Sequence, residues 1–181
     1  MTITEALAEI KTIEKRIGKK RDFIGQHLAR DERLRDPFDK DGGSAQMVAR
    51  ELQGVKDLEQ RRVTLRLRIQ EANQRIQVGV NGETKSLAEW LVWRREVAPP
   101  RQQFLRTLAQ ALDKGRKDAQ SKGMTLVGAG AQVQVGQANT VNVFVNINER
   151  ELVEEIERLE TILGDLDGQL SLKNATETIV I

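Results

Sequence analysis

Isoleucine recurs at every seventh position in the first part of this sequence, at Ile3, Ile10, Ile17 and Ile24. A seven-residue apolar repeat places one narrow stripe along an α-helix, and such helices bury their stripes against one another. Three further apolar residues widen this stripe: Leu7, Ile13 and Leu28. Thr2, with Glu5 three residues later, has the pattern of a capping box. These features predict a helix from Ile3 to about Arg35, which would be ~50 Å long.

A second apolar stripe follows a break in the chain. Pro37 cannot continue a helix, and Gly42-Gly43 frees the backbone to reverse direction. Ser44 is then a suitable helix cap, and the predicted helix runs from it to about Gln77. The apolar positions of this helix are Val48, Leu52, Val55, Leu58, Leu65, Ile69, Ala72 and Ile76. Two long stripes joined by a short loop predict an antiparallel helical hairpin of residues 3–35 and 44–77.

Turn and cap signals divide the next part of the chain. Residues 78–80 have the composition of a strand that leads into an Asn81-Gly82 turn. Ser86, with Glu89 three residues later, opens a third helix. Pro99-Pro100 should stop or kink that helix, and Pro100 can occupy the first position of the next one.

Two amphipathic helices are predicted after the proline pair. The first runs to about Ala119 and has a buried face of Leu105, Leu108 and Leu112. The second begins at Asn148, which can cap it together with Glu151. Its apolar residues follow an alternating spacing of four and three: Leu152, Ile156, Leu159, Leu163, Leu166 and Leu170.

Between these helices, the stretch from Met124 to Asn148 contains no charged residue. Apolar residues alternate with polar or small ones on both sides of a turn at residues 136–139. The alternating apolar positions are Val127, Ala129, Ala131, Val133, Val135, Val141, Val143, Val145 and Ile147. A period of two is typical of β-strands, so we predict an antiparallel β-hairpin of residues 124–148.

The predicted fold class is therefore mainly α: a long antiparallel helical hairpin, coiled-coil-like in its packing, with further helices and a small antiparallel β-hairpin. We predict three parts: residues 1–119 with the helical hairpin and the broken third helix, residues 120–148 with the uncharged hairpin, and residues 149–181 with the last helix and tail. The last part is expected to form one compact unit with the first. Aromatic residues make up only 3% of the chain, which favours thin seams between helices over a thick core.

The composition narrows the possible settings and functions. The chain has no cysteine, which excludes disulfides and thiolate metal sites. The first residues lack the apolar core of a signal peptide, and no stretch approaches the length of a membrane-spanning helix. We therefore expect the protein in a virion or in the bacterial cytoplasm, with no membrane partner.

No pattern of catalytic residues is present in the sequence, and we expect a protein that is not an enzyme and has no cofactor and no metal. His27 is the single histidine, and a packing role explains it better than zinc binding, which needs further ligands. Exposed acidic pairs such as Glu154-Glu155 lack a cleft that would fix their separation. Gly128-Ala-Gly130 is not followed by the lysine of a phosphate-binding loop. No small-molecule substrate is expected.

Several segments together carry a resemblance to a known family: residues 69–73, 81–88, 94–95, 141–147, 166–167 and 174–176. In these segments the sequence resembles the septicolysin-like family of small helical bacterial and phage proteins. The resemblance implies a long helical hairpin, an Asn-Gly step into another helix, and a valine-rich strand before a final helix. Pro99-Pro100 and the glycine-rich strand of residues 124–136 depart from the family pattern. The family name implies a cytolysin but transfers no site residue to this chain.

A self-associating structural or assembly protein is the function that these patterns favour, with a bacteriophage particle as the preferred setting. Its partners would be copies of itself, other structural proteins of a large assembly, or both. The predicted subunit contact is the uncharged hairpin, with Gln132, Val133, Gln134, Val135, Val141, Asn142, Val143, Val145 and Asn146. Trp90 and Trp93 lie on one helical face, where core packing is favoured over a partner-binding role.

Two other functions remain open from sequence alone. A secreted pore-forming protein could insert the hairpin of residues 124–148, whose strands have about the ~9–11 residues needed to span a bilayer. A nucleic-acid-binding accessory protein would use the basic clusters at Lys19-Lys20-Arg21, Arg61-Arg62 and Arg94-Arg95. Acidic residues are interleaved with these clusters, which favours solvated helix faces over a phosphate-binding stripe.

Overall fold

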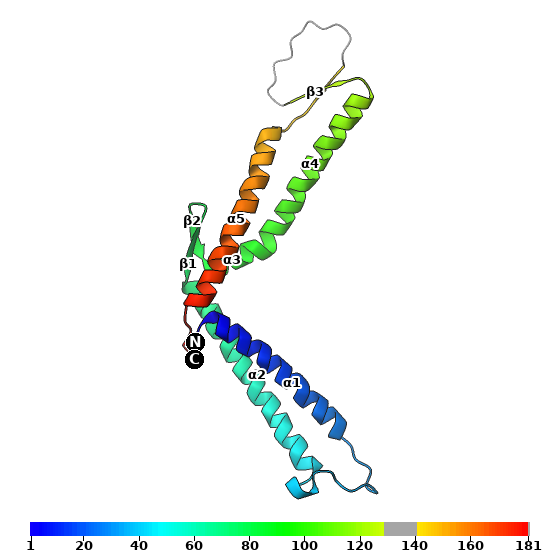
Figure 1. Cartoon of the computed structure of the whole chain (residues 1–181), viewed down its shortest axis with the longest axis vertical. Helices are drawn as coiled ribbons and strands as arrows, with labels where there is room; N and C mark the ends of the chain where they lie inside the picture. The colour runs from blue at the N-terminus through cyan, green and yellow to red at the C-terminus, as the bar shows by residue number, and fades with distance from the viewer. Residues whose placement is uncertain (129–140, 181) are drawn as a thin grey trace. The chain divides into compact units, whose positions relative to one another are not determined.

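The computed structural model describes residues 1–128 and 141–180, which divide into two compact units (Figure 1). Unit 1 comprises Met1–Ile76 and Leu170–Ile181, and unit 2 comprises Gln77–Gln169. The predicted fold class is confirmed: the chain is mainly α with a small antiparallel β-hairpin, which lies at residues 77–86. The predicted division at residues 119 and 148 stays a prediction. Among the described residues, Thr125–Val127 contacts the helix that precedes it.

In unit 1, α1 (Ile3–His27) and α2 (Ser44–Arg75) lie side by side as the predicted helical hairpin (Figure 1). Ion pairs join Lys20 to Glu51 at 2.6 Å and Arg61 to Glu9 at 2.9 Å. Because the later residue of α1 pairs with the earlier residue of α2, the two helices run antiparallel. Their buried apolar residues are Ile3, Ala6, Ile10, Ile13, Ile17, Val55, Leu65, Ile69 and Ala72.

α1 ends at His27, well before the predicted end at about Arg35. Beyond α1, side-chain carboxylates accept hydrogen bonds from backbone N–H groups that a helix would otherwise use. Asp31, for example, accepts a hydrogen bond from the Arg33 N–H at 3.0 Å. Leu28, which was predicted to lie on the stripe, is consequently 73% exposed. The predicted length of the first helix was therefore wrong, although its start and its capping box were correct.

Three aromatic rings pack together where α1 ends. The ring of His27 lies 4.5 Å from that of Phe23 and 4.9 Å from that of Phe38, measured between centroids. The Phe23 and Phe38 rings are 5.5 Å apart. His27 thus has the packing role that the sequence favoured.

Asp36 organises the loop before α2. Its carboxylate accepts hydrogen bonds from the Ser44 hydroxyl at 2.6 Å, the Ser44 N–H at 2.9 Å and the Phe38 N–H at 2.9 Å. These bonds, led by the one from the Ser44 side chain, lower the pKa of Asp36 to about 2. Ser44 is the first residue of α2 rather than its cap, so the predicted cap is corrected: Asp36 satisfies the start of the helix from eight positions earlier.

Replacement of Asp36 with alanine is expected to lower the thermal midpoint at about pH 7. A carboxyl group with a lowered folded-state pKa stabilises the fold above its unfolded pKa of about 4, and this contribution is lost as the pH falls toward 2. The difference in thermal midpoint between wild type and Asp36→Ala should therefore shrink between about pH 4 and pH 2. Thermal unfolding followed by circular dichroism across this range measures it.

Asp41→Ala is the matched control for this change, since no described residue forms a hydrogen bond or ion pair with the Asp41 carboxylate. It should leave the thermal midpoint nearly unchanged at every pH. An Asp36→Ala difference that stays constant down to about pH 2 would contradict the assigned role.

The two ends of the described chain are joined within unit 1. Thr2 and Thr178 form an antiparallel β-bridge. The Ile3 N–H donates to the Glu177 carbonyl at 3.2 Å, and the Ile179 N–H donates to the Met1 carbonyl at 2.8 Å. Ile179 is buried, which ties the tail to the helical hairpin.

Unit 2 begins with a short antiparallel hairpin formed by β1 (Gln77–Val80) and β2 (Glu83–Ser86). The predicted turn is confirmed: Asn81 and Gly82 both have positive φ, 49° and 81°, as a tight two-residue hairpin turn requires. The sequence reading had identified the first strand and the turn but not the second strand. Val78 and Val80 of β1 are buried.

The third helix continues through the proline pair instead of stopping there. α3 (Leu87–Val92) opens with the predicted Ser86–Glu89 capping box, η2 (Trp93–Val97) is π-helical, and α4 (Ala98–Ser121) follows without a break. The Ala98 N–H donates to the Trp93 carbonyl, five residues earlier. Because this wider turn accommodates Pro99 and Pro100 in the first turn of α4, the two rings interrupt the hydrogen-bond pattern without ending the helix.

α5 (Glu149–Thr176) packs against α4 along the predicted seam. Asn148 caps it as predicted, its side-chain oxygen accepting a hydrogen bond from the Arg150 N–H at 3.1 Å. The buried centre consists of Leu105, Leu152 and Leu159, and the partly buried residues around it are Trp93, Leu108, Ala109, Leu112, Ile147, Ile156 and Leu163.

The uncharged segment forms two short strands, β3 (Thr125–Val127) and β4 (Asn142–Phe144), which pair in parallel. The predicted antiparallel pairing of residues 124–148 is wrong for these strands. Alternation determines which side chains share a face, but it does not determine the direction in which two strands pair. The pore-forming alternative depends on a long antiparallel hairpin and gains no support from β3 and β4.

Candidate interaction surface

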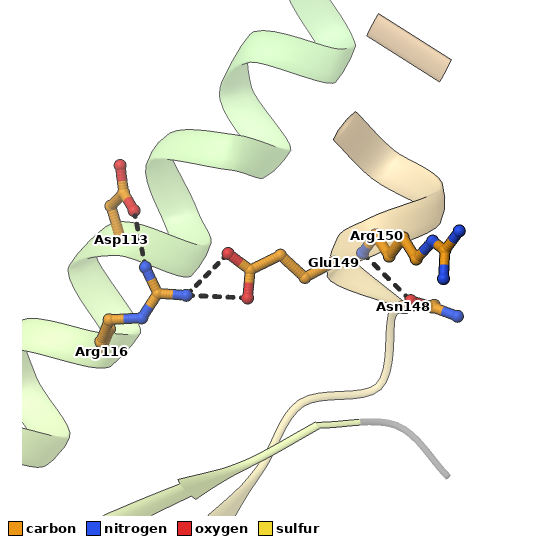
Figure 2. A network of polar contacts seen from close by, with 5 residues as sticks. All are labelled: Asp113, Arg116, Asn148, Glu149 and Arg150. Carbon is orange, nitrogen blue, oxygen red and sulfur yellow. Dashed lines mark hydrogen bonds and ion pairs between the residues drawn. The ribbon is translucent and has the colours of Figure 1, made fainter. Parts of the chain in front are cut away.

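A polar network fixes the start of α5 beside the end of α4. Figure 2 shows that Arg116 of α4 faces the carboxylate of Glu149: Nη2 of Arg116 lies 2.7 Å from each carboxylate oxygen. Asp113 contacts the same guanidinium at 3.5 Å. The hydrogen bond to Glu149 is the main cause that raises the pKa of Arg116. Since the pair is about half exposed, it orients the two helix ends more than it stabilises them.

β3 and β4 pack onto this end of α4 and enclose an apolar groove of about 240 Å³. Its residues are Leu108, Ala111, Leu112 and Gly115 from α4, together with Leu126, Val143, Phe144, Val145 and Ile147. Every lining residue is uncharged, and the groove continues the seam between α4 and α5.

Two large apolar side chains of this region are left in solvent. Val141 and Phe144 are each 61% exposed. β3 and β4 form a sheet of two strands, so each has one outer edge that no described strand pairs with. We call the group Leu126, Val141, Val143, Phe144 and Val145 the β4 patch.

Five of the predicted contact residues lie in the described part of the chain, on or beside β4. Val143, Val145 and Asn142 are half-buried, whereas Val141 and Asn146 are exposed. Val143 and Val145 line the groove against α4, so they are covered in part by their own chain. The predicted residues Gln132, Val133, Gln134 and Val135 lie outside the described residues.

Trp90 and Trp93 are core residues of unit 2 to different degrees. Trp90 is 3% exposed, and its indole N–H donates to the Val78 carbonyl at 2.9 Å. Its ring meets that of Trp93 edge to face, with 5.6 Å between centroids. Trp93 is half-buried and packs against the α4–α5 centre. Both rings therefore have the packing contacts that the sequence favoured: Trp90 with β1, and Trp93 with the α4–α5 centre.

The basic clusters are engaged in ion pairs. Arg21 lies 2.8 Å from Glu59, Arg94 lies 2.7 Å from Asp167, and Arg95 lies 2.6 Å from Glu96. Lys20 and Arg61 also pair across the α1–α2 hairpin. Carboxylates therefore neutralise much of the charge that a nucleic-acid-binding surface would need.

Metal-binding clusters and membrane-spanning helices are both absent from the described residues. Within residues 1–128 and 141–180, no group of three or more His, Cys, Asp or Glu side chains is arranged to hold a metal ion. Across the same residues, no helix combines the length and apolar character needed to cross a membrane.

Sequence reasoning missed two features of this region. Phe144 interrupts the predicted polar face, but it is the most prominent exposed ring of the β4 patch. Phe104, on α4, is 60% exposed as well, although it lies in a helix with a clear apolar face. An aromatic residue out of phase with the apolar period is the signal that could have identified both positions.

No known protein family matches the sequence, no curated protein is similar to it, and no solved structure matches its fold. The resemblance to the septicolysin-like family therefore stays a prediction.

Proposed function

We propose that this chain is a non-enzymatic structural protein that associates with further copies of itself, and that the β4 patch supplies the contact between copies. The observation that carries this proposal is the exposure of Val141, just before β4, and of Phe144 on β4, a strand whose outer edge is unpaired among the described residues. Exposed apolar residues at a strand edge pair readily with another chain unless charges prevent it. The segment from Met124 to Asn148 contains no such charge.

A second copy is the occupant that fits this surface best. The edge of one strand can pair with the same edge of another copy related by a twofold axis, which makes the contact self-complementary. Neutral groups such as Asn142 and Asn146 can form hydrogen bonds across this contact without the cost of burying a charge. A bacteriophage particle is the setting that we favour, because repeated copies of one chain build such an assembly.

The test is the mass of the particle in solution after the exposed apolar residues are charged. Light scattering should give a multiple of 20.4 kDa for wild type and a mass near 20.4 kDa for Val141→Lys/Phe144→Lys. Association of the double variant would bury each lysine ammonium group without a partner, and the cost of this burial disfavours the contact between copies. Both side chains are mostly exposed, so the helical signal in circular dichroism should be unchanged.

Gln110→Lys is the control, because it adds the same charge at an exposed position of α4 that does not line the groove. It should keep the wild-type mass. A wild-type monomer at every concentration, or a double variant that retains the wild-type mass, would overturn the proposal.

A further inference from the structure

A second pocket lies wholly within unit 2, away from the β4 patch. Its volume is about 350 Å³, which is at the small end of the range for ligand sites. β1, β2, α3, η2, α4 and α5 all contribute to it. Its lining residues are Val80, Asn81, Glu83, Lys85, Trp90, Trp93, Arg101, Glu155, Arg158, Leu159 and Ile162.

One side of this pocket is apolar and ordered by packing. Trp90 is held by its hydrogen bond to Val78, and Leu159 is 3% exposed in the α4–α5 centre. Trp93 adds a half-buried indole that packs on the same centre. These side chains provide a fixed apolar surface for the body of a small molecule.

The other side carries three basic and two acidic groups, which leaves one positive charge in excess. The Lys85 ammonium lies 2.5 Å from the Glu83 carboxylate and 4.7 Å from the centroid of the Trp90 ring. Arg101 is paired with Glu155. The pKa of Glu83 is lowered, chiefly by the hydrogen bond from Lys85 and least by the charge of Arg158.

Arg158 differs from the other two cations. Among the described residues, no carboxylate lies within ion-pair distance of its guanidinium, and no hydrogen bond holds it. Guanidinium groups form paired hydrogen bonds with carboxylate and phosphate oxygens. An anion in the pocket would therefore meet a free guanidinium beside a fixed apolar surface.

We propose that this pocket binds a small organic anion, with its carboxylate or phosphate group on Arg158 and its apolar body against Trp93 and Leu159. The proposal is independent of self-association, since it involves no residue of the β4 patch. Phosphate and carboxylate share the chemistry that Arg158 recognises, and the experiment distinguishes them.

The chain is well suited to a direct binding test, because Trp90 and Trp93 are its only tryptophans and it has no tyrosine. Both indoles line the pocket, so the intrinsic fluorescence of the full chain reports on this site. Phenylacetate and phenyl phosphate serve as the two anionic probes, and phenylacetamide serves as the uncharged one. We expect a saturable change in emission with at least one anion and none with phenylacetamide, and the anion that binds more tightly assigns the class.

Arg158→Gln should weaken the binding of that anion by about tenfold or more, since it removes a charge-assisted contact. Arg150→Gln is the matched control: Arg150 is an exposed arginine of the same helix that pairs with Glu154 outside the pocket. It should bind as wild type does. No saturable change with either anion up to about 10 mM would overturn the proposal, as would equal binding of phenylacetamide or unchanged binding in Arg158→Gln.

Discussion

Replacing Leu65 with alanine is expected to lower the free energy of unfolding by about 2–5 kcal/mol. Leu65 is 0% exposed and lies at the centre of the stripe that α2 presents to α1. The loss combines the transfer free energy of the deleted carbons with the cost of the cavity they leave. Urea unfolding followed by circular dichroism measures it from the shift in the transition midpoint.

Leu67→Ala provides the comparison on the same helix. Leu67 is 53% exposed, so the same deletion there should change the free energy of unfolding by no more than about 0.5 kcal/mol. If the two variants were equally destabilised, the assigned face of α2 would be wrong. We expect a large difference between the two variants, because a hairpin of two helices has a single buried seam between them.

Replacing Trp90 with alanine is expected to cost about 3–5 kcal/mol, the range for deletion of a large buried ring. Trp90→Phe separates the contribution of the buried ring to stability from that of its hydrogen bond. It keeps most of the apolar contact but leaves the buried Val78 carbonyl without its indole donor, which should cost about 1–3 kcal/mol. Urea unfolding of each variant gives both values.

Trp93→Phe is the matched control, because no described residue accepts a hydrogen bond from the Trp93 indole. It should be milder than Trp90→Phe. If the order were reversed, the hydrogen bond between Trp90 and Val78 would not be the stabilising contact. These experiments also show which of the two tryptophans can be replaced without loss of stability, so that the fluorescence change on ligand binding can be assigned to one indole.

Local patterns in the sequence were sufficient for most of the helices. The seven-residue repeat identified the buried side of α1, and the Ser86–Glu89 capping box identified the start of α3 correctly. Such signals act within a few residues, so they can be read without knowledge of the rest of the chain. The antiparallel hairpin followed from the short connection between two matched stripes.

The features that escaped prediction depend on residues distant in sequence. Asp36 reaches the first residue of α2 across a loop, and no local motif marks this contact. The alternation of apolar residues indicated strands at β3 and β4. Whether the two strands pair in parallel or antiparallel depends on how the chain returns to the sheet. In each case the missing information was three-dimensional proximity.

The same reasoning explains how far the two candidate sites could be predicted. The lack of charge pointed to the segment that contains the β4 patch, and three patch residues, Val141, Val143 and Val145, were among the nine predicted contact residues. Leu126 and Phe144 were not predicted. The anion pocket was not foreseen, because Lys85, Arg101 and Arg158 come from three separate segments. Each of them resembles an ordinary solvated cation when it is considered alone.

The bridge between Thr2 and Thr178 has a consequence for the order of folding. It joins opposite ends of the sequence, so closing it early would restrict nearly the whole chain for a few hydrogen bonds. Helices and the Asn81-Gly82 hairpin involve short loops and can form first. We therefore expect the bridge to form late, after the helical hairpin of unit 1 has assembled. During synthesis the bridge cannot form until Thr178 has left the ribosome.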